Sequence, residues 1–188
     1  MHRATLIAML AVCSASCANN PPGQEKPPAV SSWQLLPPST LGAARQVNQR
    51  LHAAYGEHEI SLDCVVTVNA EHLTVIGLVP GGPRMFTIDY DGRTVSAQRS
   101  TGVPEALQPE LLLNDLQLTL WPRSALQQAL EHTSWAVAEP DPRTRRLTRD
   151  GRLVAEVHYA TADAWTGRAW LVNFDRGYSI TIDSQPLE

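Results

Sequence analysis

Short segments in which apolar and polar residues alternate recur from residue 60 onward, and they constrain the fold more than any other feature of the sequence. In the clearest segment, 60–69, nearly every second residue is apolar, which is typical of a strand with one buried face. Asp91-Gly92 and Asp150-Gly151 separate such segments and are two-residue hairpin signals. We therefore expect consecutive antiparallel strands, at 60–69, 73–79, 86–90, 93–99, 143–149, 152–160, 170–175 and 178–183.

Two other stretches complete the expected elements. Segment 46–55 has apolar residues that fit either a helix or one face of a strand, and we favour the strand. The clear helical stretch lies between the two groups of strands, at 109–117 and 123–131, with Pro122 at the start of its second part.

The expected sheet is wider than its helices. About eight strands at about 4.8 Å each give a sheet about 38 Å wide, whereas two helices about 10 Å in diameter cover roughly half of it. The remaining apolar face must be covered by closure of the sheet on itself, by an apolar ligand in a concave cavity, or by a partner protein.

The first residues have the layout of a secretory signal. Arg3 is followed by nine apolar or small residues, 4–12, and then by small residues around two cysteines. An apolar run of this length is far shorter than the roughly 20 residues that a membrane-spanning helix needs. We therefore expect export without a membrane span.

Cys17 is the expected lipidation site, because the signal resembles those of bacterial lipoproteins, which end at a cysteine preceded by small residues. Small residues occupy 14–16, whereas the alternative site, Cys13, follows the β-branched Val12. An ordinary cleaved signal with a free cysteine is the other alternative. The lipoprotein resemblance also implies that Ala18 directs the acylated protein, with palmitate among its chains, to the outer membrane.

Cleavage at this site divides the chain into three parts, a signal peptide at 1–16, a proline-rich tether at 17–38 and a single domain at 39–188. Cys64 is the one remaining thiol besides the anchor. Because it lies on the apolar face of 60–69, we expect an inert core residue.

Charge and motifs exclude several classes of function. A formal net charge of −4 argues against sequence-independent nucleic-acid binding, which needs a basic face. The sequence has no nucleophile elbow, phosphate-binding glycine loop or zincin motif, and its histidines lack metal-ligand spacing. We therefore expect neither an enzyme nor a metal or cofactor. A periplasmic hydrolase is an alternative that needs Ser, His and Asp within hydrogen-bond reach in a cleft.

An arginine cluster lies in 143–152 and allows two interpretations. It can be a solvated edge hairpin that is protected from aggregation by charge. It can also contact anionic headgroups or an acidic partner. The residues expected to make that contact are Arg143, Arg145, Arg146 and Arg149.

Four segments carry a family resemblance: 71–78, 86–92, 115–122 and 173–182. They resemble a proteobacterial lipoprotein family whose genes often lie among those for aryl-polyene synthesis, and whose members are similar to the lipoprotein carrier LolA and receptor LolB. The resemblance covers most of 45–185. It implies a mainly β fold, an antiparallel open half-barrel with a helical lid over a hydrophobic cavity.

The resemblance also implies a function, that of an outer-membrane-anchored periplasmic lipoprotein that binds or passes on a lipid-like molecule. The alternative is a non-catalytic scaffold of an envelope transport or synthesis complex, with an envelope protein as partner. LolB-type receptors carry an exposed apolar residue on a hairpin loop, where this sequence has the loop 80–83. We therefore do not expect the insertion of lipoproteins into the bilayer, but the holding or passing of another lipid-like molecule, and the expected partner is a lipid or a lipidated molecule. The expected ligand-binding residues are Leu62, Val66, Val75, Phe86, Ile88, Leu112, Leu116, Trp121, Leu126, Val157, Trp170 and Val172.

Overall fold

The computed structural model describes residues 32–101 and 108–187, which belong to one compact unit that begins at Ser32. The expected signal peptide, most of the expected tether, and both Cys13 and Cys17 lie outside the described residues.

The described residues form a mostly β structure with two α-helices. The first strands are β1 (Arg45–Tyr55), β2 (His58–Val68), β3 (Leu73–Leu78), β4 (Arg84–Tyr90) and β5 (Val95–Arg99). The helices are α1 (Pro109–Leu120) and α2 (Arg123–Leu130), and a short 3-10 helix, η1, spans Pro38–Leu41. The second group of strands is β6 (Trp135–Asp141), β7 (Thr144–Arg149), β8 (Arg152–Tyr159), β9 (Gly167–Asn173) and β10 (Tyr178–Pro186).

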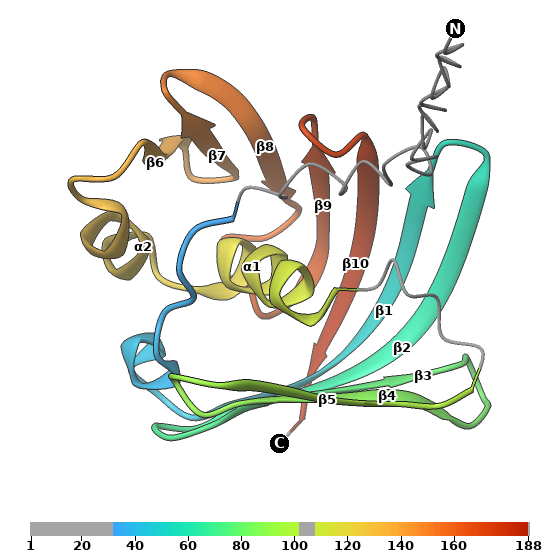
Figure 1. Cartoon of the computed structure of the whole chain (residues 1–188). Helices are drawn as coiled ribbons and strands as arrows, with labels where there is room; N and C mark the ends of the chain where they lie inside the picture. The colour runs from blue at the N-terminus through green and yellow to red at the C-terminus, as the bar shows by residue number, and fades with distance from the viewer. Residues whose placement is uncertain (1–31, 102–107, 188) are drawn as a thin grey trace, which may run out of the picture. The chain divides into compact units, whose positions relative to one another are not determined.

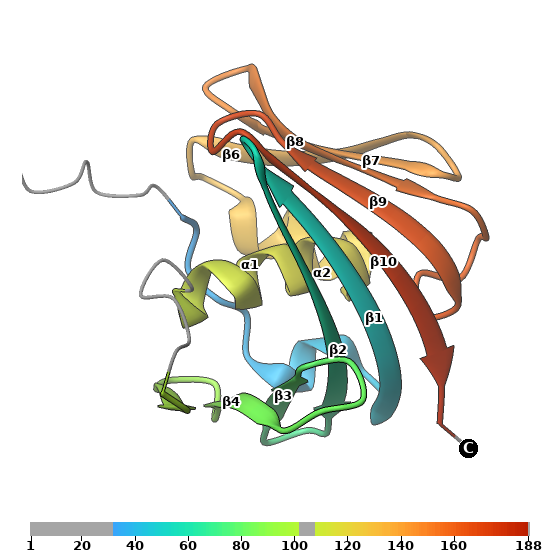
Figure 2. The same ribbon diagram turned by 90° about the vertical axis from the view of Figure 1, so that its right-hand side faces the viewer.

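All ten strands belong to one antiparallel sheet, in the order β5-β4-β3-β2-β1-β10-β9-β8-β7-β6. Neighbours in the sheet are neighbours in the chain, except that β1 pairs with β10 at the centre. The edges, β5 and β6, are therefore the strands that flank the helices in sequence. The chain has to travel from one edge to the other, and α1 and α2 lie along that route on the inner side of the curved sheet (Figures 1 and 2).

This arrangement confirms the expected fold class, an antiparallel open half-barrel with a helical cover. Segment 46–55, which fitted two interpretations, is a strand, and it holds the two groups of strands together. The sequence analysis missed β6. In this edge strand only Val137 is buried, so its apolar alternation is weak, and the strand accommodates Pro140 where its register with β7 shifts.

Residues 32–41 form a strap that packs on α1. Trp33 and Leu36 are buried. The backbone N–H of Leu36 donates to Gln117 Oε1 at 2.9 Å, and the Leu36 carbonyl accepts from Gln117 Nε2 at 2.8 Å. Asn114 donates to the Trp33 carbonyl at 3.3 Å. The structure therefore includes residues 32–38, expected as tether, in the folded unit, because two large apolar side chains bring this segment into the core.

Among the described residues, no helix has both the length and the apolar composition to cross a membrane.

Candidate ligand-binding cavity

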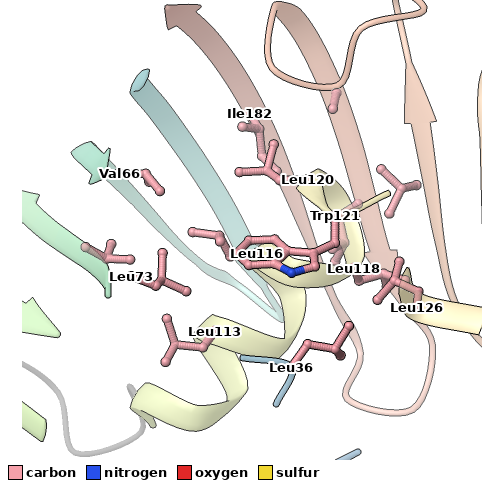
Figure 3. Packing of buried hydrophobic residues seen from close by; sticks show 14 of the residues in the cluster. Leu36, Val66, Leu73, Leu113, Leu116, Leu118, Leu120, Trp121, Leu126 and Ile182 are labelled. Carbon is pink, nitrogen blue, oxygen red and sulfur yellow. The ribbon is translucent and has the colours of Figure 1, made fainter. Parts of the chain in front are cut away.

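A cavity of about 230 Å³ lies between α1 and the inner face of the sheet. Strands β1, β2 and β10 contribute most of its wall, and α1 covers it through Leu112, Leu116 and Leu120. Figure 3 shows Leu120 turned toward Ile182 of β10, and both side chains line the cavity. The cavity lies toward the end of the sheet that carries the β1–β2 and β9–β10 turns, since Ala53, Ile60 and Tyr178 belong to its wall.

The alternation of the strands explains why the wall is apolar. Leu62, Cys64 and Val66 of β2 are buried on one face, while the residues between them are partly exposed on the other. On α1, Leu112, Leu116 and Leu120 follow one another at four-residue spacing and therefore share a face. Medium-sized aliphatic groups thus meet from both layers without filling the space between them.

Polar side chains gather at one end of the cavity. The Tyr178 hydroxyl donates to a carboxylate oxygen of Asp115, and it accepts from Asn173 Nδ2 at 3.3 Å and from Arg176 Nη1 at 3.4 Å. The β9–β10 turn fixes this arrangement, because the Arg176 backbone N–H donates to Asn173 Oδ1 at 3.0 Å. Asp115, Arg176 and Tyr178 line the cavity, and Asn173 is buried behind them.

Burial perturbs the acids of this region. The pKa of Asp115 rises from its ordinary 3.8 to about 6, chiefly because the carboxylate is removed from water, while the bond from Tyr178 and the charge of Arg176 oppose the rise. Burial and the neighbouring Asp115 raise the pKa of Tyr178 above its usual range. The Cys64 thiol is buried, with its pKa raised to about 12, which suits an unreactive core residue.

The cavity brings together five of the residues that the sequence analysis expected to bind ligand, namely Leu62, Val66, Val75, Leu112 and Leu116. Five others pack in the core away from the cavity wall: Phe86, Ile88, Trp121, Leu126 and Val157. Phe86 shows why. Its ring covers the backbone of Gly77 and occupies the place of a side chain there, since a Cβ on Gly77 would come within 2.3 Å of the ring.

Trp170 and Val172 lie on the opposite face of the sheet from the cavity, which corrects the expectation that they face a ligand. Leu171, between them, is buried and lines the cavity, whereas Trp170 is 41% exposed. Segment 169–172 carries apolar residues on both faces, so the two-residue period alone does not show which face is the inner one.

Sequence reasoning missed the polar end of the cavity. The alternation of Tyr178, Ile180 and Ile182 predicts a strand but no binding site. Asp115 gave a signal that could have been used, because it is an acid next to Leu116 and within one helical turn of Leu111 and Leu112. Arg176 gave none, since an arginine in a hairpin turn is usually solvated.

Arg145 is a buried structural residue, which corrects its expected contact with headgroups. It forms an ion pair with Glu139 at 2.7 Å and donates from Nη1 to the carbonyls of Leu118 at 2.6 Å and Trp121 at 2.8 Å. These carbonyls belong to the end of α1, where helical partners are missing. The arginine thus provides hydrogen-bond donors for the carbonyls at the C-terminal end of α1, the helix that covers the cavity.

The other arginines of the cluster are more accessible. Arg146 is half-exposed and pairs with Glu156 at 2.5 Å, and Arg149 pairs with Asp175 at 3.3 Å while its guanidinium lies 5.3 Å from the centre of the Trp135 ring. Arg143 is exposed. Strand β7 pairs on both sides, with β6 and β8, so the expectation of an edge hairpin is corrected as well.

A serine, a histidine and an acid do meet on the outer face of the sheet. His52 Nδ1 lies 3.0 Å from Ser61 Oγ, and His52 Nε2 lies 3.7 Å from a Glu59 carboxylate oxygen. The His52 and Glu59 side chains are 50% and 70% exposed. Acyl transfer needs a water-excluding site with oxyanion donors, which an exposed sheet surface does not supply.

Nor do residues 32–101 and 108–187 bring together three or more His, Cys, Asp or Glu side chains that could hold a metal ion.

Comparison with known proteins places the chain in a family. The model of the family described as "Protein of unknown function (DUF3261)" matches residues 46–186. The chain belongs to this family. The matched residues of this DUF3261 protein run from β1 to β10 and so include the sheet, both helices and the cavity. A search of curated proteins finds no match.

Solved structures with similar folds include a LolA superfamily protein from Nitrosomonas europaea, at 12% sequence identity and a TM-score of 0.43, covering 76% of this chain and 84% of the other. A DUF1329 family protein from Desulfovibrio piger matches at 8% identity and a TM-score of 0.33, covering 79% of this chain and 87% of the other. At these scores the likeness carries no inference about ligand or activity.

Proposed function

We propose that this DUF3261 protein binds a lipid-like molecule in the cavity beneath α1 and holds it or passes it on. We further propose that it does so as a periplasmic lipoprotein, anchored through acylated Cys17 in the inner leaflet of the outer membrane. The exposed Arg143 and Arg146 are available for contacts with anionic headgroups or with an envelope protein.

One observation carries the proposal, the apolar cavity itself. Its volume of about 230 Å³ exceeds the roughly 150 Å³ of an apolar protein cavity that stays dry and binds benzene. Aliphatic side chains of two layers line it, and water in such a space gains few hydrogen bonds. An apolar chain would gain about 25 cal/mol for each Å² that it buries there.

The test uses neighbouring alanines on opposite faces of β1. Ala53 lines the cavity and pairs with Ile60 and Ile180, whereas Ala54 pairs with Glu59 and Ser179 on the other face. Ala53→Phe places a ring in the cavity, and Ala54→Phe is the matched control. The full chain and both variants are purified in one detergent of known composition, and non-covalently bound lipids are extracted and identified by mass spectrometry.

We expect lipid with the unaltered chain and with Ala54→Phe, and about a tenfold weaker affinity for an apolar fluorescent probe in Ala53→Phe, because the ring removes contact area. Equal lipid content and probe affinity in the two variants would contradict the proposal. Absence of lipid and of probe binding in all three proteins would favour the alternative, a tethered scaffold without a ligand.

A further inference from the structure

The polar cluster at the end of the cavity consists of Asp115, Asn173, Arg176 and Tyr178, and it is built from three elements. Asp115 comes from α1, Asn173 ends β9, and Tyr178 begins β10, with Arg176 in the turn between the strands. The cluster therefore joins the helical cover to the sheet at the place where the apolar wall stops. A chain that lies along the aliphatic wall would bring its polar end to this cluster.

The cluster is held in place before any ligand arrives. Asn173 is 4% exposed, its amide oxygen accepts from the Arg176 backbone N–H, and the Gly177 N–H donates to the Asn173 carbonyl at 2.9 Å. Gly177 has a φ of +66°, so the tight turn that presents Arg176 suits a glycine there. A fixed turn lowers the entropy lost when a ligand binds.

We infer that the polar cluster binds the acidic head group, a carboxylate or a phosphate, of an amphiphile whose single apolar chain lies in the cavity. This inference rests on the proposed function and defines the class of ligand. The guanidinium of Arg176 provides the charge, because its planar N–H donors match the paired oxygens of carboxylates and phosphates. The Tyr178 hydroxyl accepts from that guanidinium at 3.4 Å, and Asn173 Oδ1 accepts from the Arg176 backbone N–H at 3.0 Å.

The size of the cavity suits a single chain. A volume of about 230 Å³ is about one and a half times that of a cavity that takes one benzene ring. It accommodates a segment of one hydrocarbon chain, so a single-chain amphiphile fits this site.

The cluster also has a structural interpretation, in which it only ties α1 to the β9–β10 turn. An acid in an apolar wall is an unfavourable structural contact, because the removal of a carboxylate from water costs free energy unless its hydrogen bonds compensate for it. The two interpretations differ in selectivity. A structural tie affects the binding of charged and uncharged chains alike, whereas a head-group site discriminates between them.

The experiment compares lauric acid with dodecanol, which has the same chain length and no charge, by displacement of an apolar fluorescent probe from the full chain. Dodecyl phosphate is titrated in parallel to distinguish a phosphate from a carboxylate preference. We expect the protein to bind one or both acids about tenfold or more tightly than dodecanol, as charge-assisted hydrogen bonds require. In Arg176→Gln the ratio of the dissociation constant for the acid to that for the alcohol should rise from about 0.1 to about one.

The matched control is Arg168→Gln on β9, an arginine on the outer face that pairs with Asp183 at 2.7 Å, and it should keep the ratio of the unaltered chain. Asp115→Asn removes a negative charge next to the head group and should shift the ratio in the opposite direction, toward tighter acid binding. If Arg176→Gln does not fold, Asp115→Asn still provides the test.

Equal affinity for acids and alcohol in the unaltered chain would overturn the inference while leaving the proposed function intact. A ratio unchanged in Arg176→Gln would overturn it as well. If lauric acid, dodecyl phosphate and dodecanol all fail to bind, the proposed function itself is contradicted, so the two failures are distinguishable.

Discussion

The two helices cover different parts of one sheet, and the interior differs beneath them. Beneath α1 the wall is mostly aliphatic, Tyr178 is the one aromatic residue among its described residues, and a cavity of about 230 Å³ is left. Around α2 the space is occupied by large side chains. Trp121 and Leu126 are completely buried, and the Trp135 ring meets the Trp33 ring edge to face with centres 5.8 Å apart.

The difference shows that side-chain size, more than the shape of the sheet, decides where this half-barrel is hollow. Both parts have one helix above a sheet with the same strand spacing. Indole rings fill the space around α2, and that of Trp121 is fixed by a hydrogen bond from its Nε1 to Thr40 Oγ1 at 2.9 Å. Leucine, isoleucine and valine side chains, which are shorter, leave the gap beneath α1.

The largest expected effect is in the filled part. Trp121→Ala should lower the free energy of unfolding by about 3–5 kcal/mol, because it leaves a large void and removes the bond to Thr40. Leu116→Ala, at the cavity wall, should cost about 2 kcal/mol, since one side of Leu116 already faces empty space. Urea unfolding measures both values. Equal costs would show that the two interiors are packed alike.

A somewhat smaller effect is expected where the two parts meet. Arg145→Gln should lower the free energy of unfolding by about 3 kcal/mol, because Glu139 loses its buried ion-pair partner and the carbonyls at the end of α1 lose their hydrogen-bond donor. Arg146→Gln, on the neighbouring exposed position, should cost less than about 1 kcal/mol. Thermal or urea unfolding of the pair checks this contrast, and an equally mild Arg145→Gln would argue against its role at the end of α1.

The last effect concerns the acid of the cavity and appears only when the pH is varied. The pKa of Asp115 is raised in the folded protein, to about 6 from 3.8, so the unfolded chain loses this proton first. The contribution of Asp115 to stability is therefore complete below about pH 4 and is lost as the pH rises through about 6, by about 3 kcal/mol in all.

Asp115→Asn should remove that loss. The difference in free energy of unfolding between the variant and the unaltered chain, measured in urea at several values between about pH 4 and about pH 7, should grow in favour of the variant as the pH rises. Groups with lowered pKa, such as Glu156 beside Arg146, titrate in both proteins and cancel in the difference. A difference independent of pH would show that Asp115 is not desolvated by the cavity.

The sequence was sufficient to predict the fold where apolar alternation is one-sided. β2, β3 and β4 have buried residues at every second position, and their hairpins were predicted with nearly the observed bounds. It failed at β6, an edge strand with a proline, and it could not assign the inner face of β9, where Leu171 and Trp170 are both apolar. Where both faces of a strand are apolar, alternation alone does not show which face is buried in the core.

The candidate site was predicted only in part for a related reason. The expected residues were the apolar ones of the inner face, and packing then decides which of them touch the cavity: Leu62 and Leu116 do, whereas Phe86 fills the space over Gly77. The polar cluster depends on contacts between α1 and the β9–β10 turn, with Asp115 and Tyr178 separated by 63 positions in the chain. Contacts of this kind follow from tertiary structure, not from any local pattern.

The strap over α1 has a mechanical consequence. Leu36 is clamped through both its N–H and its carbonyl by the single side chain of Gln117, and Asn114 holds the carbonyl of Trp33 one helical turn earlier. A force applied at Ser32 would act first on these hydrogen bonds and on the outer side of α1. It would therefore be resisted by the strap and the helix before it deformed the cavity beneath them.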